Sequence, residues 1–255
     1  MSCSGVTATI PGSPLLRFPI PKDARRISPG ADEADMNPPD LPWNAIDTVL
    51  LDMDGTLLDL NFDNHFWQVH VPLRYAEIRG TTREAAREEL MARYHARAGT
   101  LAWYSVDFWQ TELELDIMML KEEVAHLIAV HPHVTDFLEA VRRAAKRVAL
   151  VTNAHHKSLT LKMARTGLQA HFDFLVTSHE LGLAKEDPDF WRRLQQLFPF
   201  DPARSVLVDD SLPVLDSARS YGIRHLVSIR QPDTQQPPKD TGAYPAIDSF
   251  AELMP

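Results

Sequence analysis

The sequence that decides the fold is Val49-Leu50-Leu51-Asp52-Met53-Asp54-Gly55-Thr56-Leu57-Leu58-Asp59. Its apolar start is typical of a buried strand, and two aspartates follow at the strand end. Because side chains two residues apart in an extended chain point the same way, Asp52 and Asp54 share one face. Two neighbouring carboxylates repel each other, so this pair requires a cation or a shared proton. A calcium loop is the competing interpretation, but Leu57 and Leu58 follow where such a loop needs more oxygen ligands.

Short apolar runs of the same kind recur along the chain, each bounded by polar or turn-forming residues. Counting the first, these runs cover residues 48–53, 148–152, 174–177, 206–208 and 225–229. Amphipathic segments lie between them, at residues 135–146, 157–167, 188–197 and 214–222. Runs that are apolar on both faces indicate parallel strands buried between helices. The alternation predicts an α/β fold, a Rossmann-like parallel sheet covered by helices on both faces.

The interval 62–131 interrupts this alternation, because it contains helical patterns and no strand signal. Thr81 and Glu84 have the spacing of a capping box at the start of a helix. The apolar face that follows consists of Ala86, Leu90 and Tyr94. A helical segment inserted after the first strand predicts an all-helical cap domain seated over the sheet. We therefore expect an α/β core of residues 43–61 plus 132–255 and a cap of residues 62–131.

The first 42 residues differ from the rest of the chain, because prolines interrupt their apolar stretches. Such a segment buries too little apolar surface to offset its ordering entropy, so we predict a disordered tail. Met36 stands just before the folded pattern begins, and we hypothesise that the natural chain starts there. An intact mass of the native protein that includes residues 1–35 would contradict this hypothesis.

Composition excludes several classes of protein. With 44% apolar and 24% charged residues, the chain of 255 residues has the composition of an ordinary soluble protein. A net charge of −9 argues against binding to nucleic acid or to an anionic membrane, because both attract basic surfaces. No apolar run reaches the roughly 20 residues of a membrane-spanning helix. Cys3 is the only cysteine, so no intramolecular disulfide can form, as expected of a cytoplasmic protein.

Three more polar signals occur where later strands are expected to end. Thr152-Asn153 follows the second strand and precedes a helix, whose first backbone N–H groups can bind an anion. Lys185 precedes the helix expected from Pro188 and offers a positive charge to a phosphate. Asp209-Asp210 follows the fourth strand, and oxygen ligands from two strand ends suit Mg²⁺. Alone, Thr152-Asn153 is better explained as a helix cap and Lys185 as a solvated loop residue. In order over one sheet, the signals predict a phosphate and metal site.

This series resembles the four motifs of the haloacid dehalogenase-like superfamily, and residues 62–131 resemble the helical cap of one of its subgroups. The resemblance covers residues 47–229. More closely, residues 47–64, residues 100–104 with Asp107 and Trp109, and residues 185–187 are similar to the bacterial GMP/IMP nucleotidase branch. The resemblance implies a Mg²⁺-dependent phosphomonoester hydrolase that works through an aspartyl phosphate, and most specifically a purine (IMP, GMP or XMP) 5′-nucleotidase.

The same resemblance implies a role for each signal. Asp52 is the expected nucleophile, and Asp54 is expected to protonate the leaving oxygen and then to activate water. Mg²⁺ is expected on the Asp52 carboxylate, the Asp54 backbone carbonyl and Asp210, with Asp209 helping directly or through water. The non-bridging phosphate oxygens are expected to be held by Thr152, Asn153 and Lys185.

Other functions compete for the same motifs. A phosphatase for a sugar phosphate or phosphoglycolate would share all of them, and so would a phosphosugar mutase. A carbon–halogen hydrolase would need neither Asp54 nor a magnesium site. A non-enzymatic binding protein would need none of the catalytic side chains, all of which are present here.

The residues that would recognise a base are left open by the sequence. Candidates for stacking on a purine or bonding to it are Asn61, Asp63, His65, Trp67, Trp103, Tyr104 and Trp109. Aromatic residues at helical spacing more often pack in a core, where they bury a large area. His155 and His156 adjoin the expected phosphate site, although an exposed position at a helix start is the simpler interpretation. Asp216 is expected on the helix after the second acid pair, where it orients the loop.

Overall fold

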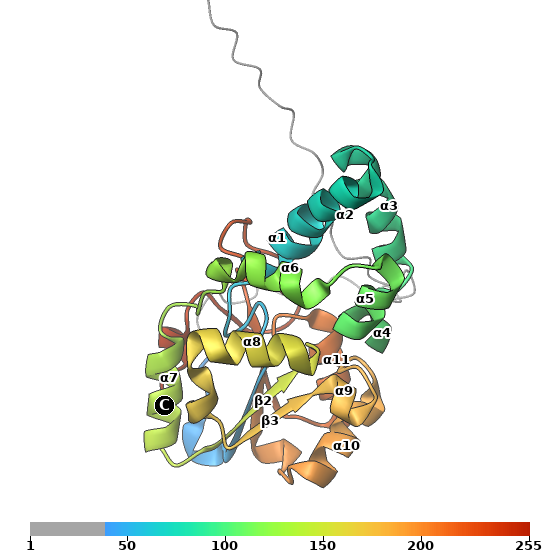
Figure 1. Ribbon diagram of the computed structural model, residues 1–255. Coiled ribbons are helices and arrows are strands. Elements are labelled where there is room, and N and C mark those ends of the chain that lie inside the picture. Colours follow the sequence, from blue (N-terminus) through green and yellow to red (C-terminus); the bar gives the residue numbers. More distant parts are fainter. Residues whose placement is uncertain (1–38) are drawn as a thin grey trace, which may run out of the picture.

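The computed structural model describes residues 39–255 (Figure 1). The tail expected over residues 1–42 therefore lies outside the described residues except for its last four positions. The start proposed at Met36 also lies outside them.

A six-stranded sheet forms the centre of the molecule, in the order β3-β2-β1-β4-β5-β6. The strands are β1 (Thr48–Leu51), β2 (Arg147–Thr152), β3 (Phe174–Thr177), β4 (Ser205–Val208), β5 (His225–Ile229) and β6 (Ala246–Ile247). Every neighbouring pair is parallel. The chain builds outward from β1 to β3 and then crosses to the other side of β1 to form β4. The carboxyl ends of β1, β2 and β4 meet at this switch point, where open α/β sheets bind ligands.

Helices cover both faces of the sheet, because successive strand side chains point to opposite faces. Val49 and Leu51 of β1 pack in one apolar cluster with α7 (Val134–Arg143) and α8 (His156–Thr166). Leu50 packs in a second cluster with α10 (Pro188–Leu197) and α11 (Leu212–Tyr221). Figure 1 shows the two layers on opposite sides of the strands, with α7 on the left and α10 on the right. The predicted α/β fold is confirmed.

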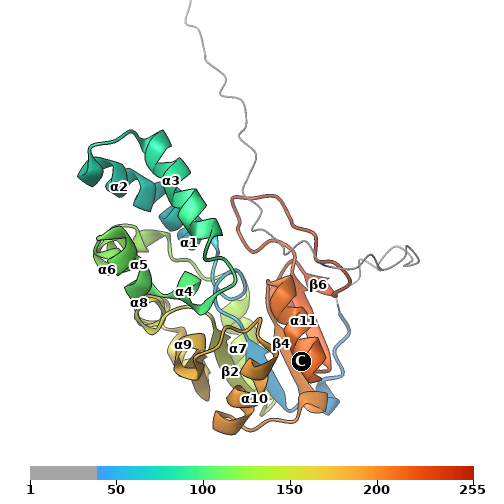
Figure 2. The same cartoon turned by 90° about the vertical axis from the view of Figure 1, so that its right-hand side faces the viewer.

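The chain between β1 and α7 is helical and has its own apolar cluster, which includes Phe66, Leu90 and Trp109. Its elements are α1 (Asn61–His65), the π-helical η2 (Phe66–His70), α2 (Val71–Arg79), α3 (Arg83–His95), α4 (Leu101–Tyr104), α5 (Val106–Leu113), α6 (Ile117–Glu123) and η3 (Ala125–Leu127). We call this group the helical insertion. Figures 1 and 2 show it at one end of the molecule, with α5 and α6 beside α8.

The two segments that connect the helical insertion to the sheet lie side by side. Leu58 pairs with Val130 in an isolated antiparallel bridge. The Asp59 N–H donates to the Ala129 carbonyl at 2.9 Å, and the His131 N–H donates to the Leu57 carbonyl at 2.9 Å. The backbone therefore enters and leaves the insertion through two paired segments.

Smaller elements complete the chain. They are η1 (Trp43–Ala45), η4 (Leu168–His171), α9 (Ser178–Leu181), η5 (Pro202–Arg204) and η6 (Phe250–Leu253). Within the described part of the chain, no helix has both the length and the apolar character needed to cross a membrane.

The capping box predicted for α3 is wrong. Thr82 is the N-cap, and its hydroxyl accepts a hydrogen bond from the Ala85 N–H at 3.2 Å. Thr81 belongs to the end of α2, because its N–H donates to the Ala76 carbonyl at 3.1 Å. The capping-box spacing placed the N-cap one residue too early. Thr81 instead completes the turn at Gly80, whose backbone is left-handed. The predicted apolar face of α3 is buried, as expected.

Two strand predictions also need correction. The first strand ends at Leu51 rather than at residue 53, because the Met53 carbonyl accepts hydrogen bonds from Leu57 and Leu58 and closes a turn. The sequence did not predict β6, because two residues are too few to produce a strand pattern.

Candidate active site

Asp52 and Asp54 lie in the turn that leaves β1. Asp52 is only 5% exposed, and its N–H donates to the Val208 carbonyl of β4 at 3.0 Å. Burial raises the pKa of Asp52 to about 7, against the opposing attraction of Lys185. Burial also raises the pKa of Asp54 to about 7, with Lys162 opposing it. Both carboxyl groups can therefore change protonation state near neutral pH.

Gly55 allows this turn to pass close to the second acid pair. Its φ of +83° lies in the left-handed region, which favours glycine. A Cβ atom at Gly55 would lie 2.9 Å from Cγ of Asp210 and 3.0 Å from Cβ of Pro232. The turn after β1 can approach Asp210 only because residue 55 has no side chain.

Lys185 lies at the centre of the site and is 2% exposed. Its Nζ donates to Asp52 Oδ1 at 2.5 Å, to Asp209 Oδ2 at 2.6 Å and to the Val151 carbonyl at 3.1 Å. Burial disfavours the charged amine, but Asp209 and Asp52 together raise the pKa of Lys185 above its ordinary value. The interpretation of Lys185 as a solvated loop residue is wrong, because its ammonium joins acids from two strand ends.

Three carboxylates in the described part of the chain are placed to share a cation. Asp52, Asp209 and Asp210 each offer an oxygen, and these oxygens all lie within 4.8 Å of one another. Burial raises the pKa of Asp209, so the cluster opposes the accumulation of further negative charge. Hard oxygen donors of this kind fit Mg²⁺, which binds through a few carboxylates and retains water. Asp54 lies beside the cluster and would contribute its backbone carbonyl rather than its carboxylate.

Thr152 and Asn153 lie at the end of β2, as predicted, but neither is the N-cap of α8. That cap is His155. The Thr152 hydroxyl accepts a hydrogen bond from the Ala154 N–H at 3.0 Å. Asn153 Oδ1 accepts from the Lys185 N–H at 2.9 Å, and its Nδ2 donates to Glu186 Oε2 at 3.0 Å. Asn153 therefore holds the loop that carries Lys185.

Sequence reasoning missed Lys162, which contacts Asp54. Lys162 is 1% exposed, and its Nζ donates to Asp54 Oδ1 at 2.6 Å. It lies on α8 beside Met163 and one turn after Leu159, both of which pack in the core. A lysine on the apolar face of an amphipathic helix was the available signal, since such a charge needs a buried partner.

Polar contacts also join the helical insertion to the core near the site. The Tyr104 hydroxyl donates to Glu186 Oε1 at 2.6 Å, and Lys157 Nζ donates to Asp107 Oδ1 at 2.5 Å. His155 lies next to this junction and is 5% exposed, so the expectation of an exposed position is wrong for His155, whereas His156 is exposed as expected. Burial lowers the pKa of His155 to about 4, and neighbouring His156 acts in the same direction. His155 is therefore neutral at physiological pH.

Most of the candidate base-binding aromatics pack against one another. Trp109 is 1% exposed, and its indole N–H donates to the Trp103 carbonyl at 2.8 Å. Tyr94 packs edge-on against Trp67, Trp103 and Trp109. Trp109 is therefore a core residue, whereas Trp103 and Tyr104 are only partly buried, on α4 beside the core. Asp216 lies on α11, as predicted, and bonds to Tyr244.

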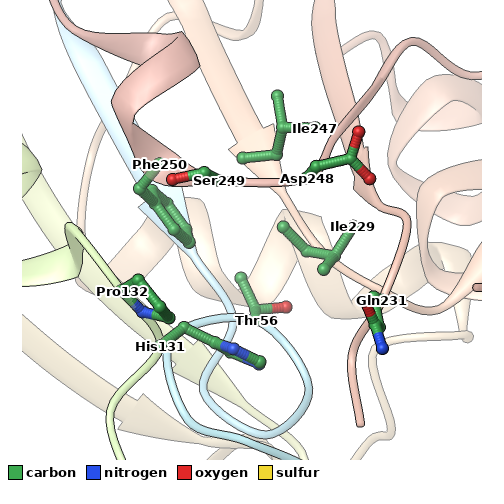
Figure 3. Close-up of a pocket in the computed structure, with 9 residues that line it drawn as sticks. All are labelled: Thr56, His131, Pro132, Ile229, Gln231, Ile247, Asp248, Ser249 and Phe250. Atoms are coloured by element: carbon green, nitrogen blue, oxygen red, sulfur yellow. The ribbon is translucent and has the colours of Figure 1, made fainter. Parts of the chain in front are cut away.

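A separate small cavity flanks the turn after β1 (Figure 3). Thr56, His131, Gln231 and Phe250 are among the residues that surround it. Its volume of about 20 Å³ is the size of one water molecule, so it does not fit a substrate.

Acids, a lysine and a hydroxyl therefore lie at the switch point of a Rossmann-like sheet. Residues 46–222 match the family model described as haloacid dehalogenase-like hydrolase. The chain therefore belongs to the haloacid dehalogenase-like hydrolases.

Known proteins resemble the chain at several levels. The GMP/IMP nucleotidase YrfG of Escherichia coli is 38% identical over 215 residues, which cover 84% of this chain and 97% of that protein. Protein CbbY of Cereibacter sphaeroides is 27% identical over 82% of this chain and 94% of its own length. The crystal structure of a HAD phosphatase from Thermococcus onnurineus superposes with a TM-score of 0.65 at 26% identity, covering 82% of this chain and 96% of that one.

Magnesium is expected to stabilise the protein through the acid cluster. Because Mg²⁺ binds the folded state, a concentration of 100 times its Kd would add about 2.7 kcal/mol to the free energy of unfolding. Asp210→Asn should remove most of this gain, whereas Asp216→Asn, an exposed acid on α11, should keep it. Thermal unfolding of both variants, with Mg²⁺ and with chelator, measures the gain in stability that each one keeps. An equal rise in Tm for both variants would contradict the site.

Proposed function

We propose that the protein is a Mg²⁺-dependent phosphomonoester hydrolase that acts on purine nucleoside 5′-monophosphates such as IMP, GMP and XMP. The observation that carries the reaction class is the contact of Lys185 with both Asp52 and Asp209 beside Asp210. The similarity to a GMP/IMP nucleotidase over 97% of its length supports the substrate class. The small phosphomonoester is the only partner in this proposal, which involves neither nucleic acid nor membrane.

In the proposed reaction, an oxygen of Asp52 attacks the phosphorus atom and forms an aspartyl phosphate. The bond between phosphorus and the ester oxygen breaks, and Asp54 gives its proton to that oxygen. Asp54 then takes a proton from water, whose oxygen attacks phosphorus and releases inorganic phosphate and Asp52. A pKa of about 7 for Asp54, raised by burial, allows it to serve as acid and then as base at neutral pH.

The surrounding side chains handle the negative charge of the phosphate. Lys185, the Thr152 hydroxyl and the backbone at Asn153 would hold the non-bridging oxygens. Asp52, Asp209, Asp210 and the Asp54 carbonyl would hold Mg²⁺, which when bound neutralises charge between the anionic nucleophile and the anionic phosphate. A phosphosugar mutase would use the same residues, so product analysis must separate the two activities.

The helical insertion is proposed to act as a cap. In this proposal, residues 43–61 and 132–255 form the catalytic core and residues 62–131 form the cap. The paired connection at residues 57–59 and 129–131 supports this division, because a narrow attachment allows rotation. Closure would exclude water during transfer to Asp52, and opening would admit substrate.

Trp103 and Tyr104 are the residues that we propose contact the purine base. Tyr104 bonds to Glu186, the neighbour of Lys185, so α4 lies next to the loop that carries the proposed phosphate-binding lysine. A partly exposed aromatic face there could stack on a purine while the phosphate lies near Lys185. We also propose a cytoplasmic location, where nucleoside monophosphates occur and where a chain with one cysteine needs no disulfide.

Release of inorganic phosphate from a panel of phosphomonoesters tests the proposal. The panel contains IMP, GMP, XMP, AMP, pyrimidine monophosphates, sugar phosphates and phosphoglycolate, with Mg²⁺ present and Asp52→Asn as the blank. Selective release from IMP, GMP and XMP is the expected result, and excess chelator should abolish it. Preference for a sugar phosphate or phosphoglycolate would overturn the substrate class. Isomer formation without phosphate release would favour the mutase.

A further inference from the structure

A series of hydrogen-bonded side chains, in which acids and lysines alternate, extends from Asp54 into the helical insertion. Lys162 Nζ donates to Asp54 Oδ1 and to Asp63 Oδ2, both at 2.6 Å. Asp63 Oδ1 in turn accepts from Lys121 Nζ at 3.2 Å. Lys162 lies on α8 of the core, whereas Asp63 and Lys121 lie on α1 and α6 of the insertion. This series of side chains therefore passes from the core to the insertion at Lys162.

The two lysines of this series are buried, whereas the side chains of Asp54 and Asp63 are 21% and 18% exposed. Lys162 and Lys121 are 1% and 2% exposed. Lys121 also lies over the aromatic rings of Phe66, at 4.4 Å, and Phe62, at 5.0 Å. A buried ammonium without a partner is strongly unfavourable, and Asp63 accepts a hydrogen bond from both lysines. Removing one member would leave an unpaired charge and would allow its neighbours to turn away.

Lys162 is held from two sides, which limits where Asp54 can point. Burial opposes the charge on Asp63, but Lys162 and Lys121 hold the pKa of Asp63 below its usual range. The Asp63 carboxylate accepts from both lysines and holds the Lys162 amine in one position. In that position the amine bonds to Asp54 Oδ1 and leaves the other carboxyl oxygen, Oδ2, as the atom that can carry the proton.

We propose that Lys162 is a positioning residue, anchored by Asp63, that orients the Asp54 carboxyl group for proton transfer to the leaving oxygen. This inference rests on the proposed function of Asp54 as acid and base. Because Asp63 belongs to the insertion, the orientation of Asp54 depends on how the insertion is seated on the core. Lys162 itself touches neither the phosphate nor the leaving group in this proposal.

The test compares two leaving groups in single turnovers with excess enzyme and Mg²⁺. Release of inosine from IMP needs a proton from Asp54, whereas release of p-nitrophenolate from p-nitrophenyl phosphate does not, because that anion is already stable. Lys162→Met should slow inosine release by about 100-fold, the loss expected from a misplaced catalytic group. It should change p-nitrophenolate release by less than about threefold. Arg165→Met, an exposed position on the same helix, should leave both rates unchanged.

Asp63→Asn provides a second variant if Lys162→Met does not fold. It should slow inosine release selectively and by a smaller factor, about 10-fold, since Lys162 keeps its bond to Asp54. Because Asp63 acts through Lys162, the double variant should be no slower than Lys162→Met alone. Multiplicative losses in the double variant would overturn the anchoring role of Asp63.

An Asp54→Asn variant separates failure of this inference from failure of the proposed function. If Asp54→Asn slows inosine release selectively but neither Lys162→Met nor Asp63→Asn does, the positioning role is wrong and the function of Asp54 stands. Equal slowing of both leaving groups by Lys162→Met would show a structural role only and would also overturn the inference. If Asp54→Asn itself leaves inosine release unchanged, the proposed function of Asp54 fails.

Discussion

Asp52→Asn is expected to lower turnover by at least about 10⁴-fold, the scale seen when an enzyme loses its nucleophile. Asparagine has nearly the same size and shape, so β1 and its turn should be retained. The amide cannot form the aspartyl phosphate, and the nearby Asp54 carboxyl is bonded to Lys162. Phosphate release measures the loss of turnover, and acid-stable labelling of the enzyme by ³²P-substrate measures the loss of the aspartyl phosphate.

Asp47→Asn is the matched control for this substitution. Asp47 immediately precedes β1, and it is exposed and bonded to Arg204 on the surface. This variant should retain its activity and its phosphoenzyme. Near-normal turnover by folded Asp52→Asn protein would remove Asp52 from the role of nucleophile.

Lys185→Met is expected to have the second largest effect, because it acts on both stability and catalysis. Without Lys185, the buried acids Asp52 and Asp209 lose the cation that contacts both of them. Breaking a buried ion pair in this way costs about 3–5 kcal/mol in the free energy of unfolding. Turnover should fall by about 10²–10³-fold, as is typical when a charge-stabilising donor is lost.

Added Mg²⁺ should restore part of the stability of Lys185→Met, because the metal can neutralise the same carboxylates. Lys239→Met is the control, since Lys239 also contacts the acid cluster, at Asp210 Oδ2, but its side chain is 31% exposed. A partly exposed ion pair contributes less than a buried one, so this variant should lose less stability than Lys185→Met. Denaturant unfolding in chelator and in Mg²⁺ measures the free energy of unfolding of each variant. A Lys185→Met protein as stable as wild type in chelator would contradict the proposed charge balance.

The strand ends were predictable because they depend on local rules. A run of apolar residues such as 49–51 indicates a buried strand, and parallel strands place their carboxyl ends at one edge of the sheet. Acids and a lysine just after such runs were therefore expected to meet. The structure brings Asp52, Lys185 and Asp209 together in this way, although the first two differ by 133 in residue number. Their chemical roles remain predictions for the variants above to test.

The contacts of the helical insertion could not be predicted in the same way. Lys162 and Asp63 are separated by 99 residues, and their contact depends on how α1 is seated against α8. No periodic pattern encodes that seating, because the orientation of one domain on another arises from packing between irregular surfaces. The same limit explains His155, whose burial depends on its neighbours across the junction with α5.

The sequence by itself determined the parallel α/β sheet, the family and the acids at the strand ends, because alternating apolar runs and short motifs are local properties of the chain. The tertiary structure decided that Lys185 lies between two acids, that Asn153 holds its loop, and that Lys162 contacts Asp54. These facts depend on distances between side chains that are remote in sequence. Such distances are set only when the whole core packs and every buried charge must find a partner.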